Sequence, residues 1–125
     1  WNPTWIKFRE AVTLPQAIED PEEAAFRQQA LARCLIAYAS DMGLVSTAVL
    51  PHQASTNRSE IQMASLDHSL WIHRAAPLDE WLLFHKRTST AQSSRGMVHS
   101  EFFAESGVLV ASMSQEGLLR KRRSD

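Results

Sequence analysis

The chain has 125 residues, 44% of them hydrophobic and 22% charged, with a formal net charge of −1 at pH 7. This length and balance favour one globular domain over residues 1–125 rather than a disordered or membrane chain. The near-zero charge does not favour a nucleic-acid partner, and we interpret the basic run at residues 120–123 as a solvated tail.

A β-strand and a long helix are the first elements that the pattern predicts. Residues 5–12 alternate and are rich in β-forming side chains, and residues 13–21 are interpreted as a connector. Asp20 can cap the helix, Pro21 suits its first position, and Glu23 completes a capping-box pattern three residues after the cap. The start of the helix is therefore marked by three local signals.

The helix is predicted over residues 22–41, which contain no proline or glycine, and Gly43 is expected to end it in a left-handed conformation. An apolar stripe at steps of three and four residues is expected to face the core. It consists of Phe26, Ala30, Cys34, Ala37 and Tyr38. Cys34, the single cysteine, is accordingly expected to be a buried and inert thiol, and it allows no internal disulfide and no thiolate zinc cluster.

From residue 44 onward the chain is predicted to be β-rich, with a hairpin at Ser106-Gly107. Apolar runs separated by turn residues occupy 44–50, 61–73, 80–89, 96–103 and 108–119. One strand, one buried helix and four or five antiparallel strands make an α+β plan in which the sheet wraps around the helix. This is the plan of the hotdog fold, with an antiparallel sheet around one long central helix.

The segment 64-ASLDHSLWIHR-74 brings a serine, an aspartate and a histidine close together in sequence. In a continuous strand, Ser65 and Asp67 face one side and His68 the other, so they cannot form a local catalytic triad. We interpret His68 as a hydrogen-bonded histidine in the core or at its rim, and Asp67 as a residue that can tie down a turn or a neighbouring strand.

The remaining histidines are spread over different segments without metal-ligand spacing, so no metal site is expected. They are His52, His73, His85 and His99. The chain also lacks a glycine-rich phosphate loop and a G-x-S-x-G motif.

A resemblance to the C-terminal half of the acyl-CoA thioesterase II family is carried by several motifs in order. They are 64-ASLDHSLWIHR-74, 79-DEWLLF-84, 94-SRGMVHSEFF-103 and 107-GVLVASMSQEGLLR-120, preceded by 34-CLIAYASDMGLVSTAVLPH-52. Together they cover roughly residues 30–120. The resemblance implies a hotdog domain and the hydrolysis of fatty acyl-CoA to a free fatty acid and coenzyme A.

In that family the water that attacks the thioester is held by an aspartate, a serine or threonine, and a glutamine. Matched motif by motif, these residues fall on Asp41, Ser65 and Gln115. The resemblance therefore implies these three as catalytic residues, with no metal or organic cofactor. The family carries two hotdogs in one chain, so we expect a second hotdog as a partner, either another part of a longer protein or a symmetric copy.

The three residues also make chemical sense at their predicted positions. Asp41 is expected at the C-terminal end of the helix, where the dipole and partial burial would disfavour its charge and make it a better base. Ser65 has no base next to it in sequence, so we assign it to orienting the water rather than to forming an acyl-enzyme. Gln115 is in phase with apolar residues of the last strand, and its partners are either a water and a carboxylate or backbone groups at a sheet edge.

Two alternatives to the thioesterase remain open. One is an enoyl-thioester hydratase that uses Asp67 and His68, although their opposite directions argue against it. The other is a non-catalytic acyl-CoA-binding or structural hotdog half.

The parts of the sequence that would contact an acyl-CoA are less defined. Candidates for the phosphates of coenzyme A are Arg58, Arg74, Arg95 and the terminal basic run, and spacing does not separate them. The side chains that could line an acyl channel, or simply form the core, are Trp71, Trp81, Phe84, Phe102 and Phe103.

Expectations about location rest on few residues. No uninterrupted apolar run approaches the roughly 20 residues of a membrane span, so no membrane partner is expected. The first ten residues carry charge where a secretory signal would be apolar, and the chain ends without a Ser-Lys-Leu tripeptide. We therefore expect a cytoplasmic protein.

Overall fold

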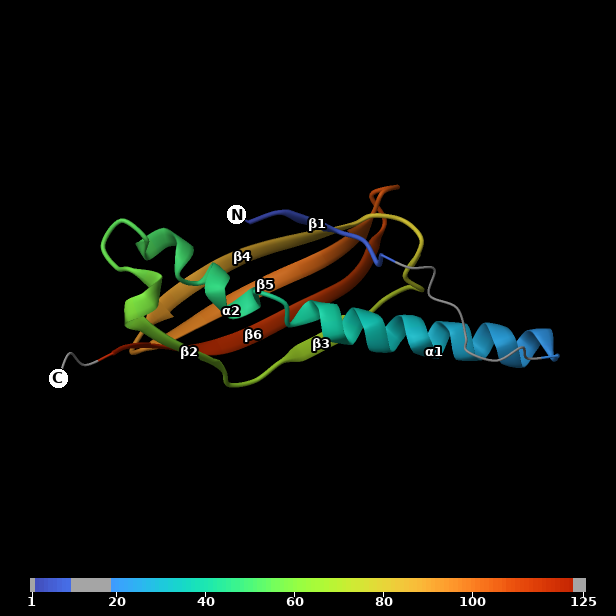
Figure 1. Cartoon of the computed structure of the whole chain (residues 1–125), viewed down its shortest axis with the longest axis horizontal. Coiled ribbons are helices and arrows are strands. Elements are labelled where there is room, and N and C mark those ends of the chain that lie inside the picture. The colour runs from blue at the N-terminus through green and yellow to red at the C-terminus, as the bar shows by residue number, and fades with distance from the viewer. Residues whose placement is uncertain (1, 10–18, 123–125) are drawn as a thin grey trace.

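The structure is a computed structural model that describes residues 2–9 and 19–122. The helical elements are α1 (Pro21–Ser40), α2 (Leu44–Thr47) and two single 3-10 turns, η1 (Leu50–His52) and η2 (Arg58–Glu60). The strands are β1 (Thr4–Ile6), β2 (Ile61–Ser65), β3 (Ser69–Ile72), β4 (Leu82–Gln92), β5 (Arg95–Ala104) and β6 (Leu109–Lys121). Figure 1 shows these elements along the chain.

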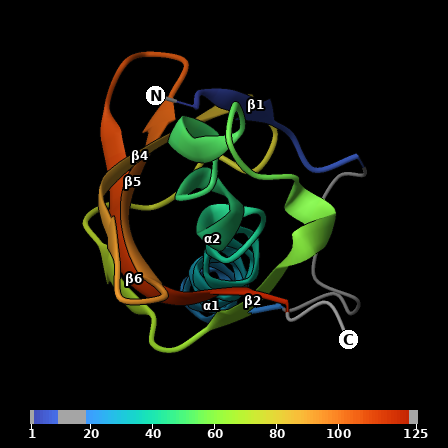
Figure 2. The ribbon, with the colours of Figure 1, turned by 90° about the vertical axis from the view of Figure 1, so that its left-hand side faces the viewer.

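All six strands lie in one antiparallel sheet in the order β1-β4-β5-β6-β2, and β3 also pairs with β6. The sheet curls around α1 and α2, as the end-on view in Figure 2 shows. This is the hotdog arrangement, so the predicted fold class is confirmed. The first predicted strand is shorter than expected, and the part of its predicted range over residues 10–12 lies outside the described residues, as does 13–18 of the connector.

Helix α1 begins where the sequence predicts. The side chain of Asp20 accepts a hydrogen bond from the backbone N–H of Glu22 at 3.0 Å, and Pro21 is the first helical residue. Glu23, expected to complete a capping box, instead forms an ion pair with Arg27 at 2.6 Å. The cap is therefore confirmed, and the carboxylate of Glu23 supports the first turns through an i, i+4 pair.

The buried face of α1 differs from the predicted one. Ala32, Ile36, Ala39 and Ser40 are buried against the sheet, whereas the predicted stripe lies on nearly the opposite side of the helix. In that stripe Phe26 is 67% exposed and Tyr38 is 74% exposed, and Cys34 is also exposed. The predictions of a core-facing stripe and of a buried Cys34 are wrong because α1 carries apolar residues on two faces. The small side chains on the other face allow the helix to approach the sheet closely.

The segment 44–50, predicted as a strand, is helical. Leu44, Thr47 and Ala48 are buried at the i, i+3 and i+4 spacing of α2. A short apolar run does not distinguish a buried helix from a strand, and here the helical turn lets the chain cover the concave face of the sheet. Gly43 precedes it with φ of +68°, which confirms the predicted left-handed stop after α1.

Two tight hairpins connect the three long strands. The predicted turn at Ser106-Gly107 is confirmed, with Gly107 at φ of +81° between β5 and β6. The turn between β4 and β5 is formed by Ser93 and Ser94, whose φ values are +53° and +61°. Sequence reasoning missed this turn because a serine pair lacks the asparagine and glycine signals of such hairpins.

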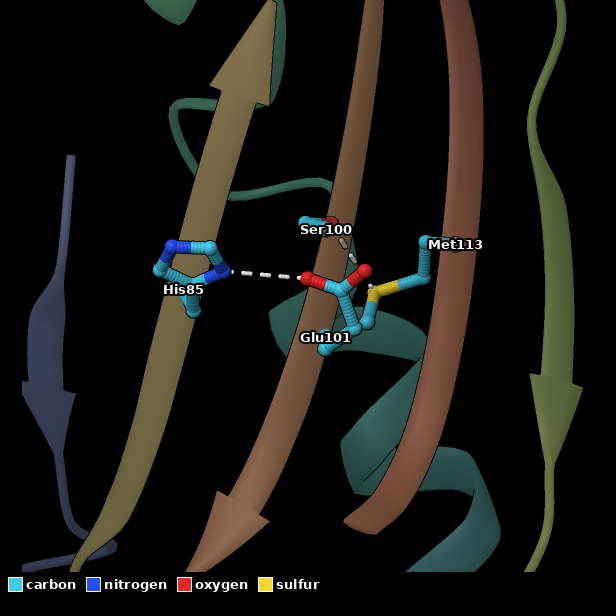
Figure 3. A network of polar contacts seen from close by, with 4 residues as sticks. All are labelled: His85, Ser100, Glu101 and Met113. Carbon is cyan, nitrogen blue, oxygen red and sulfur yellow. Dashed lines mark hydrogen bonds and ion pairs between the residues drawn. The ribbon is translucent and has the colours of Figure 1, made fainter. Parts of the chain in front are cut away.

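The two faces of the sheet differ in polarity. On the concave face Phe84 and Phe102 stack with ring centroids 4.3 Å apart. Lys86 is buried beside them with Nζ 4.6 Å from the Phe84 centroid, and this burial lowers the pKa of Lys86. On the outer face His85 of β4 contacts Glu101 of β5 at 3.0 Å, as Figure 3 shows.

The stretch Pro21–His52 meets a length and hydropathy criterion for a membrane span, because it contains an 18-residue window with a mean hydropathy of 1.4. The expectation based on uninterrupted apolar runs did not identify it. The stretch comprises α1, α2 and η1, and 39% of its most apolar window is buried against the rest of the chain. Because core helices meet the same criterion, we interpret it as the central helical layer of the hotdog.

Helix α2 rests on two glycines that face each other across β5 and β6. Gly96 and Gly117 are register partners. A Cβ atom on Gly117 would lie 2.5 Å from Cγ1 of Val45, and one on Gly96 would lie 2.6 Å from Cβ of Ala48. The absence of side chains at these two positions therefore allows α2, and with it the end of α1, to lie directly on the sheet.

We expect Gly117→Ala to lower the free energy of unfolding by about 1–3 kcal/mol, because the added methyl group overpacks the contact with Val45. Urea denaturation measures this change. The double variant Gly117→Ala/Val45→Ala should recover part of the loss because it removes the atoms that clash. A Gly117→Ala variant as stable as the wild type would contradict the close approach of α2.

Candidate active site

The structure brings together the three residues that the resemblance implies. Asp41 is the C-cap of α1, Ser65 ends β2, and Gln115 lies in β6. Nε2 of Gln115 donates a hydrogen bond to Oδ1 of Asp41 at 2.7 Å, and Oγ of Ser65 donates to the same oxygen at 3.3 Å. Residues that are 24 and 74 positions from Asp41 in sequence therefore converge on one carboxylate oxygen.

Gln115 reaches this position because of the alternation of β6. Its side chain points to the concave face, in phase with Met113 and Gly117, and is only 1% exposed. Its Nε2 is satisfied by Asp41, whereas its buried Oε1 has no hydrogen-bond partner among the described residues. An unsatisfied buried acceptor is unfavourable by about 1–3 kcal/mol.

Asp41 and Ser65 lie on the exposed side of the cluster. The expectation that Asp41 is partly buried is wrong for the described chain, in which Asp41 is an exposed C-cap residue. Asp41 Oδ1 accepts both hydrogen bonds, and these two contacts orient the carboxylate. The second oxygen, Oδ2, remains available for another proton donor.

An open cavity of about 200 Å³ lies between β2 and the start of α2. Asp41 and Ser65 line it, together with Arg58 from η2. Of the other arginines named from the sequence, Arg74 donates to the backbone oxygen of Leu109 and Arg95 lies 3.4 Å from Glu116. The structure thus separates Arg58 from the other candidates, because it shares a cavity with two of the three site residues.

The predicted strand over 61–73 is interrupted at residues 66–68, between β2 and β3. Asp67 Oδ1 accepts a hydrogen bond from the backbone N–H of Glu116 at 2.7 Å, which confirms that it ties down a neighbouring strand. His68 lies at the exposed rim, with Nε2 2.8 Å from Oγ of Ser40. Asp67 and His68 therefore engage different partners, and this geometry does not favour the pair that an enoyl hydratase would use.

Three of the other histidines, His73, His85 and His99, contact polar side chains of neighbouring strands, whereas His52 lies in η1. His73 contacts Ser112 at 2.9 Å, and His99 contacts Ser114 at 3.0 Å. Among the described residues, no group of three or more His, Cys, Asp or Glu side chains is arranged to hold a metal ion.

The aromatic residues proposed for an acyl channel are dispersed. Phe84 and Phe102 are buried in the core, Phe103 is half-buried, and Trp71 and Trp81 are exposed. Within the described chain they form no common lining, so the alternative of ordinary core residues applies to Phe84 and Phe102.

Comparison with known proteins identifies the family. A family model described as acyl-CoA thioesterase matches residues 15–118. The chain belongs to the acyl-CoA thioesterase family. One relative is acyl-coenzyme A thioesterase 8 of Mus musculus. This chain is 41% identical to it over 87 residues, which are 70% of this chain and 27% of that protein. It is 36% identical over 88 residues to acyl-CoA thioesterase 2 of Haemophilus influenzae, covering 70% of this chain and 31% of that protein.

One solved structure is similar to this chain in both sequence and fold. It is an acyl-CoA thioesterase II of Mycobacterium marinum, with a TM-score of 0.75 and 36% identity, matched over 95% of this chain and 41% of that one. The chain thus spans less than half of the solved relative, and about a quarter to a third of the two curated relatives.

Proposed function

We propose that this chain is a catalytic hotdog of an acyl-CoA thioesterase, which hydrolyses fatty acyl-CoA through a water activated by Asp41, Ser65 and Gln115. The observation that carries the proposal is the convergence of Ser65 and Gln115 on Oδ1 of Asp41, at 3.3 and 2.7 Å. A carboxylate that two donors orient beside an open cavity is placed to take a proton from a bound water.

The proposed reaction follows from the directions of these hydrogen bonds. Oδ1 of Asp41 already accepts from two side chains, so Oδ2 takes the proton of the attacking water. The water oxygen forms a bond to the thioester carbonyl carbon, the carbon–sulfur bond breaks, and the proton held by Asp41 passes to the departing thiolate. Ser65 orients the water by accepting its second hydrogen at the hydroxyl oxygen, because the proton of Ser65 is donated to Asp41, and Gln115 holds Asp41 in place through Nε2.

We further propose that a second hotdog covers part of this chain, either another part of a longer protein or a symmetric copy. The support is a set of large apolar side chains on α1 and β3 that are each more than half exposed: Phe26 at 67%, Tyr38 at 74% and Trp71 at 53%. Strands β2 and β3 lie at the edge of the sheet, and an unpaired edge favours pairing with another strand.

The experiment that tests the function is thioester hydrolysis across a panel of acyl-CoA chain lengths, followed by trapping of the free thiol. The panel is run on this chain alone and on any longer form of the protein that contains it. Thiol release, with a free acid as the second product, supports the proposal. Hydration of crotonyl-CoA without thiol release would instead identify a hydratase, and no turnover of any substrate would favour a non-catalytic half.

We propose Arg58 as a contact for the phosphates of coenzyme A, because it lines the cavity that contains Asp41 and Ser65. Arg58→Ala should raise KM for acyl-CoA by about tenfold while kcat changes little, the loss expected for one charged hydrogen bond. Steady-state kinetics measure both constants.

The matched substrate is the same acyl chain on pantetheine, which lacks the nucleotide and its phosphates. KM for this substrate should be the same in the wild type and in Arg58→Ala. An equal rise of KM for both substrates would show that Arg58 acts on the shape of the cavity and not on the phosphates.

A further inference from the structure

The interruption between β2 and β3 is a defined shift in the pairing with β6. Ser65 is opposite Gly117 and Ser69 is opposite Ser114. Three residues, 66–68, therefore face two residues of β6, 115–116, so the edge carries one extra residue, as in a β-bulge. The two residues of β6 at this point are Gln115 and its neighbour Glu116.

The carboxylate of Asp67 takes the place of a backbone acceptor at the bulge, where the hydrogen-bond ladder along β6 is interrupted. The backbone oxygen of Glu116 still accepts from the N–H of Leu66 at 2.9 Å. The N–H of Glu116 donates instead to the carboxylate of Asp67 at 2.7 Å. A charged acceptor makes this a stronger hydrogen bond than the neutral one it replaces, and it fixes the backbone next to Gln115.

His68 reaches in the opposite direction, to the last turn of α1. The hydroxyl of Ser40 donates its one proton to the backbone oxygen of Ala37 at 2.7 Å. Ser40 Oγ must then accept from His68, which assigns the proton to Nε2 of the imidazole across the 2.8 Å contact. Ser40 is fully buried and adjoins Asp41, so this bond fixes the backbone next to Asp41.

We propose that Asp67 and His68 are positioning residues that hold Gln115 and Asp41 at the distance required for the shared water. The segment that follows Ser65 is thus bound to the immediate neighbours of both other site residues, Glu116 and Ser40. Neither side chain has a hydrogen bond to the site residues themselves, so their effect passes through the backbone. The catalytic consequence rests on the proposed thioesterase function, whereas the positioning itself does not.

The positioning is tested without any assay of activity, by NMR of the ¹⁵N-labelled protein. In the wild type the side-chain amide of Gln115 should resonate away from the signals of exposed glutamines, because it donates to Asp41. Asp67→Ala and His68→Ala should each move this signal toward the exposed position. Asp67→Asn keeps an acceptor and His68→Gln keeps a donor, so both should retain the wild-type signal.

Two exposed residues of the same types, Asp79 and His52, supply matched controls. Asp79→Ala and His52→Ala should leave the Gln115 signal unchanged. An unchanged signal in Asp67→Ala and His68→Ala as well would overturn the positioning role, whatever the activity of the protein.

Steady-state kinetics of the same variants test the effect of the positioning on catalysis. Asp67→Ala and His68→Ala should lower kcat by about 10- to 100-fold with KM within about twofold, because a misplacement of about 1 Å reduces the rate on this scale. Asp67→Asn and His68→Gln should recover most of the rate. If Asp41→Asn abolishes turnover while the two alanine variants retain it fully, the inference fails and the proposed function stands. If the wild type hydrolyses no acyl-CoA, the proposed function fails, and the Gln115 signal alone decides the positioning role.

Discussion

Replacing Asp41 with asparagine should lower kcat for acyl-CoA hydrolysis by about 10²- to 10⁴-fold, the contribution expected of a general base. Asparagine keeps an oxygen that can accept from Ser65 and Gln115, which now donate to Oδ1 at 3.3 and 2.7 Å. The geometry is therefore retained while the group that takes the proton of water is lost. We expect Tm to change by no more than about 4 °C, equivalent to about 1 kcal/mol. Thiol release and thermal denaturation measure the two quantities.

Asp20, at the other end of the same helix, provides the matched control. Asp20→Asn also replaces an aspartate by asparagine, and asparagine caps a helix about as well as aspartate does. Its activity and stability should equal those of the wild type. Full activity in Asp41→Asn would refute the assignment of the base and favour the alternative of a non-catalytic hotdog half.

Replacing Gln115 with methionine should lower kcat by about 10²-fold and leave the free energy of unfolding unchanged or slightly higher. Methionine has a similar volume, and the site is only 1% exposed, so the core should remain filled. The substitution removes the donor to Asp41 and also the buried Oε1 without a partner. Gln115 is one of two donors that orient Asp41, and a misplacement of a catalytic group by about 1 Å lowers the rate by about 10²-fold. Removal of the unsatisfied acceptor relieves about 1–3 kcal/mol.

Gln62, on the exposed side of β2, is the control for this substitution. Gln62→Met should change neither kcat nor stability, as measured by thiol release and urea denaturation. If Gln115→Met lost stability by several kcal/mol but kept its kcat, Gln115 would be a structural residue whose amide serves the sheet and not the reaction.

Several features of the fold were predictable because their signals are local. The cap at Asp20, the left-handed Gly43 and the hairpin at Ser106-Gly107 each depend on a few neighbouring residues, and the structure confirms them. The face of α1 that packs on the sheet was not predictable in this way. Phe26 and Tyr38 are the larger side chains, yet Ala32 and Ala39 are buried, because close approach of the helix depends on the sheet beneath it.

The helical conformation of 44–50 shows the same limit. Its apolar residues suit a strand as well as a helix, and the choice depends on Gly96 and Gly117, more than 40 residues away in sequence, which open space for α2. Sequence reasoning could not detect this space, although two glycines in strands are a signal of close backbone approach.

The site itself was predictable only in part. Periodicity indicated that Gln115 is a polar residue on an apolar face in need of partners, and the structure supplies Asp41 as one of them. The assignment of Asp41 and Ser65 came from the family resemblance, since neither has a local signal of its own. The alternation argument rejected a triad at Ser65, Asp67 and His68, but it assumed a continuous strand. The alternation argument did not predict the bulge at 66–68, because a shift of one residue depends on the register of two strands far apart in sequence.

The central claim is that Asp41 and Gln115 act as a unit on one water, and a double variant tests it most directly. Residues that act as a unit lose activity together, so kcat of Asp41→Asn/Gln115→Met should equal that of Asp41→Asn within about threefold. We predict this result for kcat measured by thiol release. Losses that multiply in the double variant, or a double variant as active as the wild type, would contradict a shared site.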